Sequence, residues 1–460
     1  MSVLQLRATI LLTLLMGAAV AGVAAAQAPS PVTGDWDGAL KVPAGIEVPL
    51  TLHLRDAGST IDSPDQNAAG VPVSLTRDKD QWVVDIPASR ARFTGALSAD
   101  GQSLDGTFVQ GGASLPAHFT RRAPGAPAPV RDRPQTPRPP YPYLTQEASF
   151  LSGAGVRLAG TLSLPPGKGP FPAVVMIAGS GPQNRDETIE GHKPFAVIAD
   201  RLTRAGIAVL RYDKRGVGGS SGSYTLATGS DFGADAEAAV AWLHAQPGIA
   251  EGKLGLIGHS EGAEIAPSVA NADPRVAFVV LLSAPGVSGA RIIASQQRAI
   301  LYASGLAPAV VEGKAAVERQ LLAAVVGAHD AAGARTAARD VLVRSGMPAD
   351  RAAAEAEQVS SPWYREFLDD NPAPALRRLK KPVLVVAGSK DLQVLPDLNL
   401  PVIRDALAGN ADARIVELDG LNHLLQPATT GAPSEYGTIT TTVAPAALDL
   451  IVDWVVGRTR

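Results

Sequence analysis

The hydrophobic and polar residues of this chain follow two different patterns on either side of a proline-rich stretch. From residue 34 to residue 122, before that stretch, apolar and polar positions alternate with a period of two, as in Val48–Leu54, and turn-forming residues such as Asp56–Gly58 separate the runs. Alternation of this kind is typical of strands with one face in a core. It predicts a small antiparallel β domain over residues 30–122, either a partly closed barrel or a sandwich.

After the proline-rich stretch, short apolar runs alternate with segments of helical periodicity. A helix beginning at Pro194 would keep Phe195, Ile198 and Leu202 on one face. Strands that alternate with helices predict a parallel sheet covered by helices on both faces. We expect strands at residues 148–151, 156–164, 173–178, 207–212, 254–257, 276–282, 383–387 and 413–418, and helices at 194–205, 231–246, 395–407 and 446–456.

The strand–helix rhythm is interrupted between residues 287 and 371. This segment is rich in alanine, has helical periodicity and contains no convincing strand. An all-helical insertion between two strands of a parallel sheet is best placed over the carboxyl ends of the strands. We therefore expect one α/β domain over residues 144–460, with a helical cap at about 287–371.

The proline-rich stretch itself spans residues 123–143. Proline fixes its own backbone angle and favours extended polyproline II conformation over packed elements. The stretch also carries several arginines. We expect a solvated linker between the two domains.

Composition excludes several classes of protein. Of 460 residues, 46% are hydrophobic and 18% are charged, which is typical of a globular protein. The formal net charge of −3 gives no electrostatic reason to expect binding to nucleic acid. Cysteine is absent, so disulfides, thiolate metal sites and a cysteine nucleophile are excluded. The histidines show no metal-binding spacing, and we expect neither a metal nor a cofactor.

The first 26 residues have the pattern of an export signal. Arg7 precedes a mostly apolar run, Ile10–Val23, and Ala24–Ala26 offers a cleavage site of the A-x-A type, so cleavage is expected after Ala26 or nearby. The alternative is an uncleaved membrane anchor. No other segment approaches 18 uninterrupted apolar residues. We expect a periplasmic or secreted protein without stable membrane insertion after cleavage.

A candidate nucleophile lies where one apolar run ends. Leu254–Ile257 leads into Gly258-His259-Ser260-Glu261-Gly262, which fits the G-x-S-x-G nucleophile elbow, and the residues that follow favour a helix. The glycines allow strand and helix to close around a strained corner. Ser260 is the predicted nucleophile.

A serine hydroxyl needs a base to remove its proton and an acid to orient that base. After a nucleophile elbow, the triad residues occur in the chain order serine, acid, histidine. Only two histidines follow Ser260, and one of them, His329, falls within the helical insertion. His423, after the last predicted strand, is therefore the expected base. The acid should follow the strand at 383–387, where Asp391 is favoured and Asp397 is the second choice.

The oxyanion of an acyl-transfer reaction needs backbone donors. One should be the N–H of Glu261, the residue after the nucleophile, and the second should come from the loop after residues 173–178. We favour Ser180 there, with Gly181 close behind. A phosphate-binding loop is the competing interpretation of Gly179–Gly181, but the segment has neither G-x-G-x-x-G nor Gly-Lys-Ser/Thr.

Several motifs resemble those of EstD-type carboxylesterases, which are bacterial α/β-hydrolases with an N-terminal β domain and a helical cap. The similar segments are Ala178–Asp186, Asp213–Gly216, Gly258–Gly262, Gly388–Asp391 and Asn422–Gln426, with Ser63–Gln66 and Val109–Gly112 in the β domain. The resemblance covers nearly all of the chain after the predicted signal. It implies an α/β-hydrolase fold with a helical cap, preceded by a small all-β domain. It also implies Ser260, Asp391 and His423 as the triad and short- to medium-chain carboxylic esters as substrates.

Three functions are compatible with these patterns. The first is a serine carboxylesterase that acts on a small-molecule ester through an acyl-enzyme intermediate. The second is a serine peptidase of the aminopeptidase kind on the same fold. The third is a non-catalytic binding protein of the cell envelope, in which the β domain would carry the function.

Overall fold

The computed structural model describes residues 30–460, except for residues 43–45, 64–67, 111–112 and 128–131. The predicted signal, Met1–Ala26, lies outside the described residues. The described chain forms two compact units. The β unit contains the residues up to Asp132 together with Ile189–Gly191, and the α/β unit contains Arg133–Thr188 and His192–Arg460.

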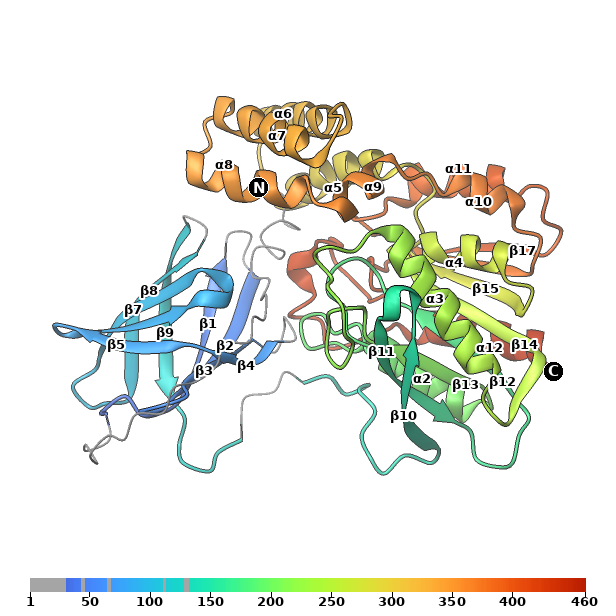
Figure 1. Cartoon of the computed structure of the whole chain (residues 1–460), viewed down its shortest axis with the longest axis horizontal. Coiled ribbons are helices and arrows are strands. Elements are labelled where there is room, and N and C mark those ends of the chain that lie inside the picture. The colour runs from blue at the N-terminus through green and yellow to red at the C-terminus, as the bar shows by residue number, and fades with distance from the viewer. Residues whose placement is uncertain (1–29, 43–45, 64–67, 111–112, 128–131) are drawn as a thin grey trace. The chain divides into compact units, whose positions relative to one another are not determined.

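The β unit is one curled antiparallel sheet (Figure 1). Its strands are β1 Gly34–Val42, β2 Ile46–Leu54, β3 Thr60–Ser63, β4 Ala68–Pro72, β5 Ser74–Asp78, β6 Gln81–Ile86, β7 Ala91–Leu97, β8 Ser103–Gln110 and β9 Ala113–Arg121, in the order β4-β3-β2-β1-β9-β8-β7-β6-β5. Alternate side chains face a single core, where the rings of Phe93 and Phe119 pack edge to face beside Trp36. A single sheet that curls around one core is an open barrel. Of the two predicted forms, the β domain is therefore the partly closed barrel and not the sandwich.

The α/β unit is built on an eight-stranded sheet. Its strands are β10 Leu144–Leu151, β11 Arg157–Leu164, β12 Phe171–Ile177, β13 Ala208–Tyr212, β14 Ile249–His259, β15 Val276–Leu282, β16 Val383–Gly388 and β17 Ala413–Leu418, in the order β10-β11-β13-β12-β14-β15-β16-β17. From β13 to β17 neighbouring strands are parallel, as predicted. The prediction of a wholly parallel sheet is wrong for β10 and β11, which pair antiparallel in a hairpin at one edge.

Helices cover both faces of this sheet and bury two cores (Figure 1). Residues of α2 (Pro194–Arg204) and α12 (Pro445–Thr459) form the core on one face. The other core contains residues of α3 (Gly229–His244), α4 (Glu261–Ala272), α10 (Ala373–Arg378) and α11 (Pro396–Ala406). β12, β15 and the second half of β14 are almost fully buried between them, which explains their continuous apolar runs. The predicted fold class is confirmed.

Six helices lie between β15 and β16, and the five that precede α10 form the predicted cap. They are α5 Gly289–Ala303, α6 Pro308–Val326, α7 Ala331–Arg344, α8 Ala349–Val359 and α9 Pro362–Asp369. They pack around a separate small core that includes Leu321, Val325 and Leu342. Helix α9 also contacts the N-terminal turn of α3, where the carboxylate of Glu366 accepts hydrogen bonds from the backbone and hydroxyl of Ser230.

The proline-rich stretch contains no helix or strand among its described residues, but its second half is not a solvated spacer. Arg133 is buried and donates hydrogen bonds to the carbonyl oxygens of Ile439 and Gly437 at 2.9 and 3.0 Å. The side chain of Gln135 bonds the backbone of residues 442–443. The prediction is wrong here because proline content reports backbone stiffness and does not reveal which polar side chains meet carbonyl groups 300 residues away.

Candidate active site

Ser260 lies at a sharp corner between β14 and α4. Its φ of 53° and ψ of −116° place a non-glycine residue in the left-handed region, and it is the cap residue before the first turn of α4. Its backbone N–H bonds the carbonyl of Leu282 at the end of β15. Strain of this kind persists only where the surroundings hold it, and it concentrates at functional sites. The strand–turn–helix context that the motif requires is therefore present.

The two glycines of the elbow are required by close backbone approach. A Cβ at Gly258 would lie 2.1 Å from the carbonyl oxygen of Gly262, and one at Gly262 would lie 1.9 Å from that of Ile177. Neither clash can be relieved by rotating a side chain, because backbone atoms cause both. The predicted role of these glycines is confirmed: they let strand and helix close around Ser260.

His423 and Asp391 meet at the carboxyl ends of neighbouring strands. His423 Nδ1 lies 2.8 Å from Asp391 Oδ2, and both side chains are buried. The other carboxylate oxygen of Asp391 accepts the backbone N–H groups of Gln393 and Val394, each at 2.8 Å. Asp391 is thus held as an oriented carboxylate against the histidine ring.

The loop that carries His423 is a tight turn beside the elbow. Asn422, fully buried, accepts the N–H groups of Leu424 and Gln426 through its side chain. The carbonyl oxygen of His423 accepts the hydroxyl of Ser283 at 2.8 Å. The ring centroid of His423 lies 4.8 Å from that of His259, the residue before Ser260. The structure therefore places the predicted base against the residue that precedes the predicted nucleophile.

The second-choice residues lie elsewhere. Asp397 is exposed in the first turn of α11, and His423 is bonded to Asp391 instead. His329 is exposed between α6 and α7 of the cap. Of the candidate acids and bases after Ser260, Asp391 and His423 are the two that the structure brings into hydrogen-bond contact.

The loop after β12 passes directly beside the nucleophile. A Cβ at Gly179 would lie 2.9 Å from Glu187 Oε1 and 3.2 Å from the Cβ of Ser260, so glycine eases this close approach. In the described part of the chain no protein acceptor is found for the N–H groups of Ser180 and Glu261. The choice of Ser180 over Gly181 as the second oxyanion donor stays a prediction.

The side chain of Glu261 joins the elbow to the cap. Its carboxylate is buried, pairs with the ammonium of Lys214 and accepts the indole N–H of Trp363 on α9. The indole of Trp363 stacks on Phe367 with ring centroids 5.3 Å apart. These contacts place α9 against the helix that begins at the nucleophile, as expected for a cap.

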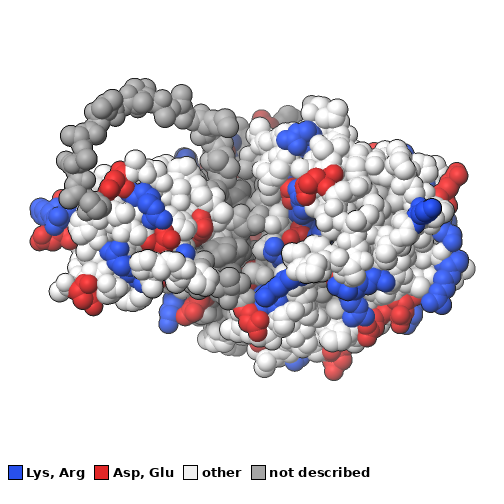
Figure 2. Space-filling model, turned by 90° about the horizontal axis from the view of Figure 1, so that it is seen from below, with Lys and Arg blue, Asp and Glu red and all other residues white. Residues whose placement is uncertain are grey.

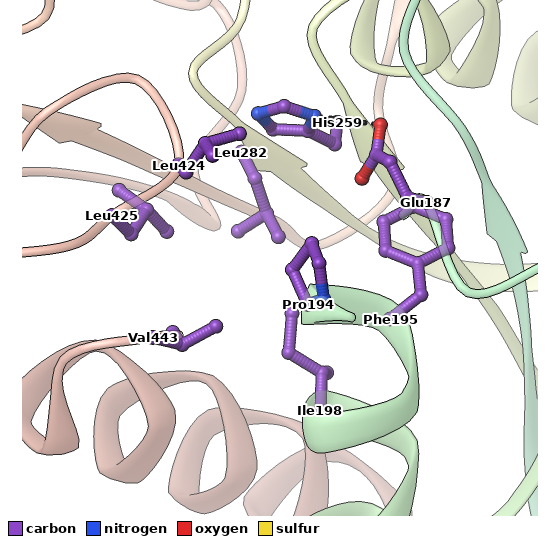
Figure 3. Close-up of a pocket in the computed structure, with 9 residues that line it drawn as sticks. All are labelled: Glu187, Pro194, Phe195, Ile198, His259, Leu282, Leu424, Leu425 and Val443. Carbon is purple, nitrogen blue, oxygen red and sulfur yellow. Dashed lines mark hydrogen bonds and ion pairs between the residues drawn. The ribbon is translucent and has the colours of Figure 1, made fainter. Parts of the chain in front are cut away.

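Sequence reasoning missed Glu187. Its side chain is 1% exposed, and its Oε1 lies 2.9 Å from His259 Nδ1 and accepts the N–H of Gly179 at 2.6 Å. Figure 3 shows the pair at the wall of a cavity of about 10 Å³, which is otherwise lined by apolar side chains. A space of that size holds about one water molecule, so this cavity is not the substrate site. No periodicity or local motif marks Glu187, because its partners are 8 and 72 residues away.

Charge and metal content add limited information about ligands. On the face shown in Figure 2, acidic and basic side chains are interspersed and no broad basic area is visible. Among the described residues, no three histidine, cysteine, aspartate or glutamate side chains are grouped to hold a metal ion. No helix in the described ranges is both long enough and apolar enough to cross a membrane.

Comparison with known proteins gives matches of two kinds. The chain is 30% identical over 268 residues to the esterase EstD of Thermotoga maritima, which confirms the resemblance inferred from the motifs. The match covers 58% of each sequence, which is less than the nearly complete coverage expected from the motifs. The chain thus spans less than two thirds of that curated relative. An esterase structure from Pyrococcus furiosus is 17% identical, with 65% of this chain and 91% of that chain covered and a TM-score of 0.41. A hypothetical protein from Pseudomonas aeruginosa is 16% identical, with coverage of 72% and 98% and a TM-score of 0.45.

The fold assignment rests on the strand order and on a family match. The family model described as X-Pro dipeptidyl-peptidase (S15 family) matches residues 154–400, more than half of the chain. The matched residues contain Ser260, Asp391 and the whole helical cap, and they end before His423. The chain therefore belongs to the X-Pro dipeptidyl-peptidase (S15) family.

Proposed function

We propose that this protein is an exported serine carboxylesterase that cleaves short- to medium-chain carboxylic esters through Ser260, His423 and Asp391. The single observation that carries the proposal is the buried His423–Asp391 contact of 2.8 Å on loops beside a strained serine elbow. Support for the ester substrate comes from the sequence identity with an esterase. Support for export comes from the N-terminal pattern and the absence of cysteine.

The geometry suits acyl transfer in two steps. Because Nδ1 of His423 is bonded to Asp391, Nε2 is the nitrogen that takes the proton of Ser260 as its oxygen attacks the ester carbonyl. The N–H groups of Glu261 and Ser180 would stabilise the oxyanion. The intermediate expels the alcohol, which receives the proton from His423, and leaves an acyl-enzyme. Water, deprotonated by His423, then releases the carboxylic acid and restores Ser260.

The peptidase alternative is favoured by one observation, the family match. An enzyme that removes dipeptides from a free N-terminus must bind the terminal ammonium, and an unpaired carboxylate is the natural partner for it. Three buried carboxylates near the elbow have partners: Glu187 with His259, Glu261 with Lys214, and Asp391 with His423. Glu264 on α4 is also buried, lies beside Asp370, and has one oxygen without a partner among the described residues. The ester is favoured over the peptide by the sequence identity with an esterase.

The experiment that tests the function compares esters with amides. The purified protein is assayed on p-nitrophenyl esters from acetate to decanoate and on alanyl-prolyl p-nitroanilide, with Ser260→Ala as the control. We expect ester hydrolysis that falls as the acyl chain lengthens, and loss of at least about 10³-fold in Ser260→Ala because the nucleophile is removed. The circular dichroism spectrum of the variant should match that of the parent protein.

Two results would contradict the proposal. Faster cleavage of the dipeptidyl anilide than of any ester would assign the protein to the peptidases. Full ester turnover by Ser260→Ala would refute the assignment of the nucleophile.

A further inference from the structure

A buried pair, Glu187 and His259, touches all three segments that the proposed mechanism uses. His259 precedes the nucleophile, Glu187 binds the N–H of Gly179 in the oxyanion loop, and His259 Nε2 lies 3.0 Å from the carbonyl oxygen of His423. Glu187 comes from the loop between β12 and α2, with a φ of 52°. A left-handed glutamate at such a place is an outlier that calls for a functional explanation.

The hydrogen-bond pattern determines the protonation of His259. Its Nδ1 faces a carboxylate oxygen and its Nε2 faces a carbonyl oxygen, and both partners are acceptors. The same oxygen of Glu187 also accepts the N–H of Gly179, so it acts as an acceptor toward both groups. His259 is therefore an imidazolium ion, with an N–H directed to each side.

The charges around His259 agree with this assignment. Burial alone would lower its pKa, but the charge and hydrogen bond of Glu187 outweigh burial, and the pKa is raised above the ordinary value for histidine. The other titratable groups that face it are His423, whose ring centroid is 4.8 Å away, and Asp391. Figure 3 shows apolar side chains on the remaining sides, including Leu282, Leu424 and Phe195.

We infer that Glu187 and His259 are positioning residues, which hold the backbone of the catalytic histidine and the oxyanion loop at fixed distances from Ser260. The inference rests on the proposed function. Asp391 orients the ring of His423 from one side, while His259 and Ser283 hold its carbonyl oxygen from the other. A neutral His259 has a single N–H and would have to release either Glu187 or His423.

Glu187→Gln tests this role through the pH dependence of kcat. Without the carboxylate, burial is no longer opposed and the pKa of His259 falls into the range used for assay. Above that pH one of two bonds is lost: the new amide either accepts from Gly179 and from Nδ1, which frees the His423 carbonyl, or donates to Nδ1, which frees Gly179. The plateau of kcat should therefore become bell-shaped, with kcat down about 10- to 100-fold at pH 8 and KM within about twofold, because misplacement by 1 Å can cost that much. His259→Gln should lower kcat similarly at every pH without a new alkaline limb.

Asp235→Asn is the matched control. Asp235 is equally buried and pairs with Arg215, but it does not contact the His423 loop. We expect this variant to lose stability and to keep the pH profile of the parent protein. If Glu187→Gln behaves in the same way, the positioning role is refuted while Ser260→Ala still tests the esterase independently.

A second measurement is made on the parent protein and needs a variant only to assign its signals. The side-chain ¹⁵N shifts of the histidines in the labelled full-length protein, assigned with His259→Gln, report protonation directly. We expect both nitrogens of His259 to be protonated at pH 8. A neutral imidazole there would overturn the inference.

Discussion

At the scale of single residues, the strained backbone positions of the α/β unit cluster near His423. The non-glycine residues with positive φ in the described part of this unit are Glu187, Ser260, Ser283 and Leu425. One is the predicted nucleophile. Ser283 bonds the carbonyl oxygen of His423, Leu425 lies in the same loop, and Glu187 is linked to it through His259. Each such conformation costs roughly 1–3 kcal/mol. The surrounding buried hydrogen bonds must offset that cost, so the site is held rigid before substrate arrives.

A comparison of two aspartates tests the triad at this scale. Asp391→Asn should keep the fold but reduce kcat by about 10⁴-fold, because the amide no longer holds His423 with Nδ1 protonated. Asp397→Asn should change kcat by less than about twofold, since Asp397 is exposed on α11. Ester hydrolysis and thermal unfolding of both variants provide the check. Equal activity of the two variants would refute the assignment of the acid.

At the scale of elements, the cap has a core of its own that contains an ionisable group. Glu318 on α6 is 4% exposed and accepts a hydrogen bond from the side chain of Gln297 on α5 at 2.8 Å. Its second carboxylate oxygen and the amide oxygen of Gln297 have no partner among the described residues. Burial raises the pKa of Glu318 to about 7, against the lowering effect of the Gln297 hydrogen bond.

This raised pKa predicts that the cap loses stability as pH rises. Between the ordinary glutamate pKa of 4.5 and about 7, the folded state keeps a proton that the unfolded state has released, so the free energy of unfolding falls through this range. Glu318→Gln removes that dependence. We expect the variant to gain up to about 3 kcal/mol relative to the parent between pH 5 and pH 8.

Chemical denaturation at the two pH values measures the difference. Glu312→Gln on the same helix is the control, because Glu312 is 45% exposed and pairs with Arg298 on the surface. That substitution should have an effect of less than about 1 kcal/mol at either pH. A Glu318→Gln effect of the same size at pH 5 and pH 8 would contradict the prediction.

At the scale of the whole molecule, contacts between residues far apart in sequence complete the α/β unit. Arg133, at the start of the unit, bonds carbonyl groups of residues 437 and 439, and Gln135 bonds residues 442–443. The loop they hold runs between the His423 turn and α12. The second half of the proline-rich stretch therefore belongs structurally to the α/β unit, whereas the β unit has a separate core.

Two arginines of the stretch provide the test. Arg133→Ala should destabilise the α/β unit by about 2–4 kcal/mol, because it removes two charge-assisted hydrogen bonds from a buried site. Arg138→Ala should change stability by no more than about 0.5 kcal/mol, since Arg138 is exposed. Loss of ester hydrolysis with increasing urea measures the unit specifically. Equal midpoints for the two variants would show that Arg133 contributes nothing.

The sequence by itself determined the elements and the predicted catalytic residues. Strand and helix positions follow from local periodicity; β15 and β17 begin and end at the predicted residues, and α2 begins at Pro194 as predicted. Ser260 could be identified because the elbow needs glycines at fixed spacing. His423 and Asp391 followed from chain order at strand ends, because parallel strands present their carboxyl ends at one edge of the sheet.

Only the tertiary structure decided which distant groups meet. The antiparallel hairpin β10–β11, the burial of Arg133 and the pairing of Glu187 with His259 depend on contacts between segments with no shared local pattern. Hydrogen bonds of this kind are set by the packing of loops, and a polar residue in a loop has the same local sequence signature whether it is solvated or buried. Periodicity therefore located the catalytic segments, and packing alone determined what holds them together.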